Sequence, residues 1–190
     1  MKSLQPDAQD LFDQALTFTE AIPWVPQEGR QDAAYFSEAD VVLYGGAAGG
    51  GKTDLAIGLA ITAHRETLFI RRQVKQLGAV LDRIAQIIDP KREGWSGQEG
   101  RWLIPPWNIV KRQIVVGSTP ALGDETKYQG RPRDLLVIDE VHQYKAKGSD
   151  QGWAFHLLAE TIPAVITLTG TFFLIVTALR LLWPSSASWG

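Results

Sequence analysis

The chain has 190 residues, of which 45% are hydrophobic and 21% are charged. This length suits a single domain of ordinary size, and the apolar fraction excludes wholesale disorder. The absence of cysteine excludes disulfide bonds and thiolate metal sites. The first ten residues are polar and acidic, so we expect no secretory signal and a cytoplasmic protein.

Charge is distributed unevenly along the chain. Residues 1–40 hold eight acidic and two basic residues, a net charge of −6, whereas the remainder holds 13 acidic and 17 basic residues. A mildly basic body is compatible with contacts to nucleic-acid phosphates and equally with a solvated surface. The basic residues come in close pairs at 71/72, 91/92, 111/112, 131/133 and 145/147.

The chain falls into three predicted parts. Residues 1–40 form a lead-in, because Pro6, Pro23 and Pro26 interrupt any long helix and leave room only for a short one at 8–18. Residues 41–171 form the domain itself. Residues 172–190 form an apolar tail.

Regular elements are expected only from residue 41 onward. Short apolar runs predict buried strands, and apolar residues at helical spacing predict packed helices. We expect strands at 41–44, 67–70, 135–138 and 165–169, helices at 52–63, 74–88 and 151–161, and a hairpin of strands 101–104 and 113–116. Strands that alternate with helices indicate an α/β fold with helices on both faces of a mostly parallel sheet.

A glycine-rich segment lies between the first expected strand and the first expected helix. It has the pattern G-x-x-x-x-G-K-[ST], known as the Walker A or P-loop motif, and comprises Gly46, Ala47, Ala48, Gly49, Gly50, Gly51, Lys52 and Thr53. Its backbone N–H groups and the helix N-terminus suit the phosphates of ATP. Lys52 would neutralise the β- and γ-phosphates, and the Thr53 hydroxyl would bind Mg²⁺. This motif predicts a P-loop NTPase.

Two carboxylates, Asp139 and Glu140, end the expected strand at 135–138, as in a Walker B motif. The carboxyl ends of parallel strands form the ligand-binding edge of an open α/β sheet. Asp139 would hold Mg²⁺, and Glu140 would polarise the attacking water as the catalytic base.

Other polar residues near this edge give weaker signals. Arg71 and Arg72 follow the second strand, where either would stabilise charge on the γ-phosphate, contact DNA or remain simple surface charge. The three histidines, His64, His142 and His156, do not form a metal-binding pattern, and we interpret them as surface or core residues.

Several segments resemble the large terminase subunit of tailed bacteriophages. They are the phosphate loop with its flanks at 44–55, residues 68–72 and 76–77, the stretch Lys127-Tyr128-Gln129-Gly130-Arg131-Pro132, and residues 136–140. The resemblance covers roughly residues 30–140. It implies an ATPase motor of RecA-like, three-layer fold that packs double-stranded viral DNA into a capsid, with a portal protein and a small terminase subunit as partners and homo-oligomer formation as an open question.

After Glu140 the sequence departs from that family. Residues 139–142 read Asp-Glu-Val-His and residues 166–171 are rich in threonine, which look more like the DExH box and third motif of superfamily-two helicases. By this second resemblance Thr169, Gly170 and Thr171 would relay the nucleotide state. Neither the nuclease domain of terminases nor a second RecA-like lobe is recognisable. We therefore expect an incomplete fold and read the chain as a fragment, a recombinant or a junction near residue 140.

The apolar segment at 162–183 has two interpretations. It is long enough to span a membrane, but Pro163, Gly170 and its threonines favour a core strand followed by a packed segment. We expect no membrane partner.

Three functions remain open at this level. They are the terminase motor, the first RecA-like lobe of a helicase, and a nucleotide-binding remnant without hydrolysis. Ala47 and Ala48 stand where some terminases have an arginine, so the loop supplies no arginine finger. We therefore expect the isolated chain to bind Mg-ATP but to turn it over slowly.

Overall fold

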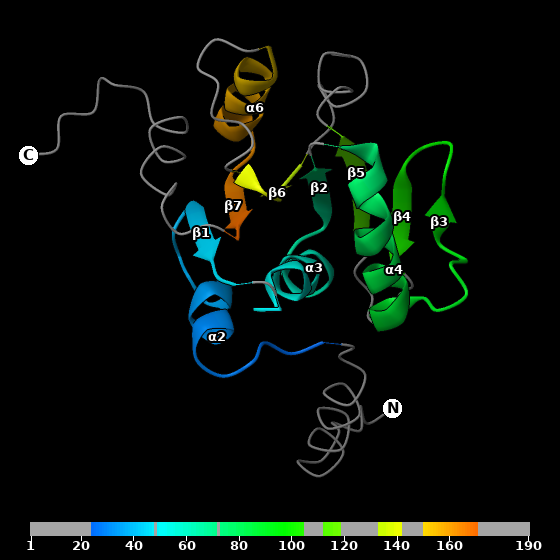
Figure 1. The fold of residues 1–190 in the computed structure, drawn as a ribbon, viewed down its shortest axis with the longest axis horizontal. Coiled ribbons are helices and arrows are strands. Elements are labelled where there is room, and N and C mark those ends of the chain that lie inside the picture. Colours follow the sequence, from blue (N-terminus) through cyan, green and yellow to red (C-terminus); the bar gives the residue numbers. More distant parts are fainter. Residues whose placement is uncertain are drawn as a thin grey trace, which may run out of the picture.

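The computed structural model describes residues 24–47, 49–71, 73–104, 112–118, 133–141 and 150–170. Figure 1 shows the arrangement of the elements and carries their labels. In chain order they are α2 (Arg30–Tyr35), β1 (Val41–Gly45), α3 (Lys52–Thr62), β2 (Glu66–Arg71), the 3₁₀ helix η1 (Val74–Gln76), α4 (Leu77–Ile88), β3 (Trp95–Ser96), β4 (Arg101–Ile104), β5 (Arg112–Ser118), β6 (Leu135–Ile138), α6 (Asp150–Thr161) and β7 (Ala164–Thr169).

The strands form one sheet in the order β1-β7-β6-β2-β5-β4-β3. The pairs β1–β7, β7–β6, β6–β2 and β2–β5 are parallel, whereas β5–β4 and β4–β3 are antiparallel. The predicted α/β class with a mostly parallel sheet is therefore confirmed. The strand β7 lies between β1 and β6, so it separates the strand that precedes the phosphate loop from the strand that precedes the acid pair.

Each central strand contributes alternate side chains to two hydrophobic cores, as the two-residue period of a strand requires. Phe69 and Val137 join α3 and α4 in one core, while Leu68 and Leu136 face the other. The second core is closed by α6 through Phe155, Leu158 and Ile162, the last just after the helix. The sheet is thus covered on both faces, which gives the expected three layers.

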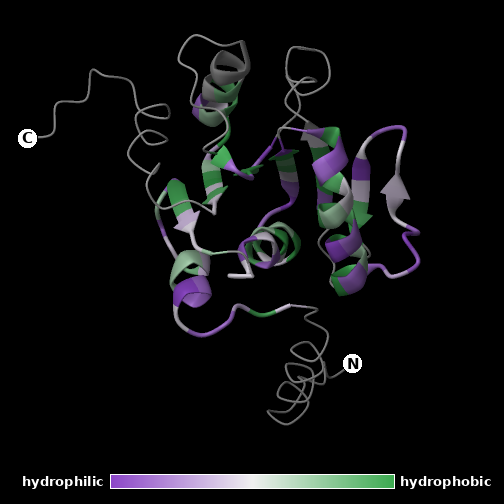
Figure 2. Cartoon of the chain, viewed as in Figure 1, coloured by the Kyte–Doolittle hydropathy of each residue, from purple (hydrophilic) through white to green (hydrophobic). Residues whose placement is uncertain are grey.

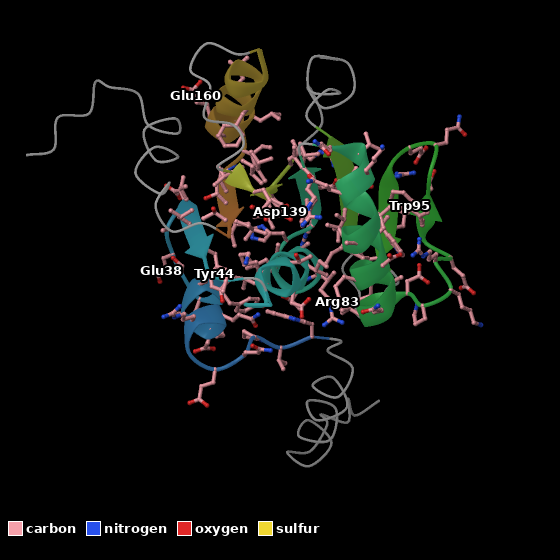
Figure 3. All side chains as sticks on the ribbon, in the orientation of Figure 1. Glu38, Tyr44, Arg83, Trp95, Asp139 and Glu160 are labelled. Carbon is pink, nitrogen blue, oxygen red and sulfur yellow. The ribbon has the colours of Figure 1, made fainter. Side chains whose placement is uncertain are left out.

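Helices α3 and α4 differ because they lie at different depths. The α3 helix is buried along its whole middle, and it carries hydrophobic residues on every side. The α4 helix buries Val80, Ile84 and Ala85 and turns polar residues outward, a mixture visible in Figure 2. Arg83 of α4, labelled in Figure 3, donates from Nε and Nη2 to the two carboxylate oxygens of Asp54 at 2.7 and 2.8 Å, which ties the first turn of α3 to α4.

Residues 24–36 pack on α3, although no element was predicted there. The Trp24 ring lies so close to Gly58 that a Cβ atom at that glycine would come within 2.3 Å of it. The Tyr35 hydroxyl is 2.8 Å from the hydroxyl of Thr62. The short helix α2 was not predicted because its flanking prolines and acidic residues indicate an irregular lead-in.

The helix predicted at 74–88 begins differently from the prediction. Residues 74–76 form a 3₁₀ turn, closed by a bond from the Gln76 N–H to the Gln73 carbonyl at 3.0 Å, and the α-helix begins at Leu77. Such 3₁₀ turns are common at helix starts. The helix ends at Ile88 with Asp89 as its C-cap, before Pro90 as expected.

Asp89 then holds the small antiparallel part of the sheet in place. Its carboxylate accepts the N–H of Glu93 at 3.1 Å, that of Gly94 at 2.8 Å and the indole N–H of Trp102 at 2.9 Å. Trp102 is fully buried and pairs with Ile114 across the predicted hairpin, which is confirmed. The residues that connect its two strands lie outside the described residues.

The two interpretations of the apolar segment at 162–183 can be compared only over its first part. Residues 164–169 form the parallel strand β7, and the expected segment from residue 171 onward lies outside the described residues. In the part of the chain that the structure describes, no helix has the length and apolar character needed to cross a membrane.

Candidate nucleotide-binding site

The phosphate-loop residues connect β1 to α3 in a tight turn. Gly49 has φ of 83° and Gly51 has φ of 66°, a left-handed region that only glycine adopts readily. The N–H of Gly50 donates to the carbonyl of Ala47 at 3.1 Å and closes the turn. Gly49 and Gly51 are therefore required by backbone conformation. Ala48 lies outside the described residues.

Lys52 and Thr53 are the first two residues of α3, so both lie at the positive end of the helix dipole. The Lys52 ammonium donates to the carbonyl oxygens of Gly46 at 2.9 Å and of Ala47 at 2.8 Å. These bonds fold the lysine back over the loop that precedes it. The positive charge of Lys52 is therefore held next to the loop, where it is available to bind an anionic ligand.

The loop is supported from below by Gln31 of α2, a residue that the sequence did not single out. Gln31 is 3% exposed, donates from Nε2 to the Gly51 carbonyl at 2.9 Å, and accepts the N–H of Gln27 at 2.9 Å. A Cβ atom on Gly51 would come within 2.1 Å of this Nε2 atom. Gly51 is thus constrained both by its φ angle and by the close approach of Gln31.

The acid pair follows β6 at the same edge of the sheet. Asp139, labelled in Figure 3, is 2% exposed, and its own N–H donates to the Ile70 carbonyl of β2 at 3.0 Å. Arg71, the last residue of β2, donates from Nε to Asp139 Oδ2 at 2.5 Å, and its Nη2 contacts the same oxygen. Burial raises the pKa of Asp139 above its ordinary value, while the Arg71 charge acts in the opposite direction.

Glu140 has φ of 56°, a left-handed conformation that is strained for a residue with a side chain. Its carboxylate faces the end of β7, because a Cβ atom built on Gly170 would lie 4.0 Å from each of its oxygens. Strain of this kind is concentrated at functional sites, where the fold imposes an unfavourable backbone on a reacting residue.

The end of β7 links the two halves of the site. The N–H of Gly46 donates to the carbonyl of Thr169 at 3.2 Å, and Gly170 lies beside Glu140. Thr169 is buried. The end of β7 therefore bonds to the start of the phosphate loop, and Gly170, which follows it, lies beside Glu140. Thr171 and Arg72 lie outside the described residues, as does the stretch at 127–132.

The oxygen donors at this edge fit Mg²⁺. A hydroxyl at Thr53 and a carboxylate at Asp139 are hard ligands, and Mg²⁺ is usually held by one or two carboxylates together with substrate phosphates. Within the described ranges no group of three or more His, Asp or Glu side chains could hold a metal by itself. His64 lies 3.8 Å from Asp134 at the opposite edge of the sheet, and burial lowers its pKa.

Structures of known proteins share this fold. The large terminase ATPase domain of Thermus phage P74-26 is 14% identical, with 87% of this chain and 70% of that chain covered at a TM-score of 0.51. The HK97 bacteriophage large terminase is 15% identical, covering 86% of this chain and 41% of that chain at 0.51. An S. cerevisiae Dbp5 variant bound to Nup159, Gle1, IP6 and ADP is 12% identical, covering 87% and 49% at 0.58.

These likenesses show a P-loop ATPase fold, and they confirm the resemblance to both terminase ATPase domains and helicase-like domains. The chain spans less than half of the last two proteins. A comparison with curated protein sequences gives no match. A family profile described as type III restriction enzyme, res subunit, matches residues 13–174. Because this match covers most of the chain, the chain belongs to that family.

Proposed function

We propose that this chain is the ATP-binding and ATP-hydrolysing motor domain of a phage DNA-packaging terminase large subunit. The observation that carries the proposal is the convergence of the phosphate loop, the acid pair and the end of β7 at one edge of the sheet. Gly46 bonds to Thr169, and Gly170 lies beside Glu140. The terminase-like stretch at 127–132 and the two similar terminase structures are the reasons for proposing a terminase motor.

Each residue has a proposed role. Backbone N–H groups of the phosphate loop and of the first turn of α3 would bind the phosphates of ATP, and Lys52 would exchange its two carbonyl partners for β- and γ-phosphate oxygens. Thr53 and Asp139 would hold Mg²⁺, which would neutralise charge on the phosphates when bound. Glu140 accepts a proton from the attacking water.

The end of β7 would report the nucleotide state to the rest of the domain. Thr169, Gly170 and Thr171 are the proposed relay, because Thr169 bonds to the phosphate loop and Gly170 lies beside Glu140. The portal and small terminase subunit are the proposed partners, with double-stranded DNA as the substrate that is moved.

Binding is tested by titration calorimetry with Mg-ATP. Lys52→Ala should weaken binding by about 1.5–3 kcal/mol, since it removes a charge-assisted contact. Lys91→Ala, an exposed lysine outside the site, is the matched control and should bind as the wild type does. Equal affinity of the Lys52 variant and the control would refute the phosphate-loop assignment.

Hydrolysis is tested separately by steady-state phosphate release. Glu140→Gln should retain ATP binding while turnover falls by about 10²–10⁴-fold. Wild-type turnover in this variant would show that Glu140 is not the base. A wild type that binds ATP without any turnover would instead favour the nucleotide-binding remnant.

The helicase lobe is the second candidate function, because the Dbp5 structure gives the higher TM-score, 0.58 against 0.51. Stimulation of turnover separates the two candidates. A packaging motor should respond to double-stranded DNA in the presence of its partner proteins, whereas a helicase lobe should respond to single strands. Genes for a small terminase upstream and a portal downstream would support packaging.

A further inference from the structure

Arg71 makes a close contact with Asp139 that the sequence did not predict. It ends β2, the neighbour of β6, and its guanidinium donates from Nε to Asp139 Oδ2 at 2.5 Å, with Nη2 on the same oxygen. The two side chains are 17% and 3% exposed. The contact is therefore made where solvent screens it little.

The same guanidinium has a second anchor on the other side. Its Nη1 atom donates to the carbonyl oxygen of Gln76 at 2.6 Å, at the end of the 3₁₀ turn η1. Gln76 precedes α4, so Arg71 is braced between β6 and the start of that helix. A planar fork with donors in fixed directions suits such a double contact, and a lysine ammonium on a flexible stem does not.

We infer that Arg71 is a positioning residue for Asp139, which fixes how that carboxylate presents its oxygens to the Mg²⁺ of a bound nucleotide. This inference rests on the proposed function, because it concerns the same nucleotide site. It differs from the three alternatives left open by the sequence, which were charge stabilisation on the γ-phosphate, contact with DNA and simple surface charge, since the contacts above direct its donors to Asp139 and Gln76.

Two opposing effects decide the expected result. The positive charge of Arg71 repels a nearby cation, so its removal would strengthen Mg²⁺ binding if charge alone mattered. Loss of the group that orients a metal-binding carboxylate typically weakens metal affinity by about 10–100-fold. The short, buried and doubly anchored geometry favours orientation, so we expect weaker binding of Mg²⁺.

The experiment follows a fluorescent ATP analogue bound to the full chain, titrated with Mg²⁺ and also measured in EDTA. In Arg71→Gln the Mg²⁺ concentration at half-saturation should rise by about 10–100-fold. Affinity for the analogue in EDTA should stay within about twofold of wild type. Arg71→Lys keeps the charge but not the fork, so it should resemble Arg71→Gln. Arg92→Gln, which removes an exposed ion pair with Asp82, should have no effect.

Two further measurements keep the outcomes distinct. In an Asp139→Asn background, Arg71→Gln should add little, because the residue through which it acts is already changed. Melting in EDTA checks that the variants fold, and Arg71→Lys replaces Arg71→Gln if the latter does not. An unchanged or improved Mg²⁺ response in either Arg71 variant overturns the inference. Absence of analogue binding in the wild type would instead refute the proposed function.

Discussion

Asp89 and Asp139 are both aspartates with almost no exposed surface, 6% and 2% of the residue respectively, yet their surroundings differ. Asp89 accepts N–H groups from Glu93, Gly94 and the Trp102 indole. Burial raises its pKa, but these bonds together lower the pKa below the ordinary value of 3.8. Asp139 is closely paired with Arg71, and burial keeps its pKa above 3.8.

The difference separates scaffold from site. A carboxylate whose bonds favour its charged form stabilises the fold, whereas one whose charged form is disfavoured by burial destabilises it at neutral pH. Asp89 therefore belongs to the structural part of the molecule. Asp139 has the surroundings that we expect of a residue in the proposed nucleotide site, where binding is favoured at the expense of stability.

The largest effect is expected at Asp89. Asp89→Asn places an amide group among N–H donors and leaves some of them unpaired, which should lower the free energy of unfolding by about 2–4 kcal/mol. Urea unfolding measures the change. Asp82→Asn, at a side chain 61% exposed, is the matched control and should change stability by less than about 0.5 kcal/mol. Equal effects at both positions would contradict the comparison.

The pH dependence of the stability loss in Asp89→Asn gives a second test of the comparison. Because the pKa of Asp89 is lower in the folded state, its stabilisation is fully present above the unfolded value of 3.8 and is lost as pH falls through the folded value. The stability gap between wild type and Asp89→Asn should stay constant near neutral pH and narrow below about pH 4. A stability difference between wild type and Asp89→Asn that widens in acid would contradict the lowered pKa of Asp89.

A smaller effect is expected from the strained backbone of Glu140. Glycine tolerates a φ of 56° and alanine does not, so Glu140→Gly should be more stable than Glu140→Ala by about 1 kcal/mol. Thermal melting of the two variants compares them directly. At the exposed Glu93, which has no positive φ, glycine should give no such advantage.

The smallest effect is expected at Asp139, where two contributions to stability oppose each other. Without metal, Asp139→Asn should change the free energy of unfolding at neutral pH by less than Asp89→Asn does, because it removes the burial cost of the charged carboxylate but also the ion pair with Arg71. Since its pKa is raised in the folded state, the cost of the charged form is present above that pKa and fades as pH falls. Unfolding in EDTA at several pH values measures this. A loss of unfolding free energy as large as that of Asp89→Asn would contradict the proposed difference between the two aspartates.

Much of the sheet could be predicted from the sequence because a run of four apolar residues, as at 135–138, is stable only when buried on both faces. The phosphate loop could be predicted because its backbone requires glycine at positions 49 and 51. The order of the strands could not, since the pairing of β1 with β7 joins distant parts of the chain.

Two residues of the site show where sequence reasoning ends. Arg71 and Arg72 are adjacent, and neighbouring side chains of a strand point to opposite faces, so spacing alone could not choose between them. Gln31 lies in a short helix among prolines and acids, and no pattern marks its bond to Gly51. The contact of Arg71 with Asp139 and that of Gln31 with Gly51 both depend on the packing of segments that are distant in sequence.

The position of β7 in the sheet also bears on the order in which the protein forms. Strands β2, β5 and β6 pair among themselves, but β1 joins them only through β7, the last strand along the chain to be described. Pairings between segments distant in sequence form slowly, and chains fold from the N-terminal side during synthesis. On the ribosome, the phosphate loop and Asp139 would therefore reach the same edge only after residue 169 has emerged.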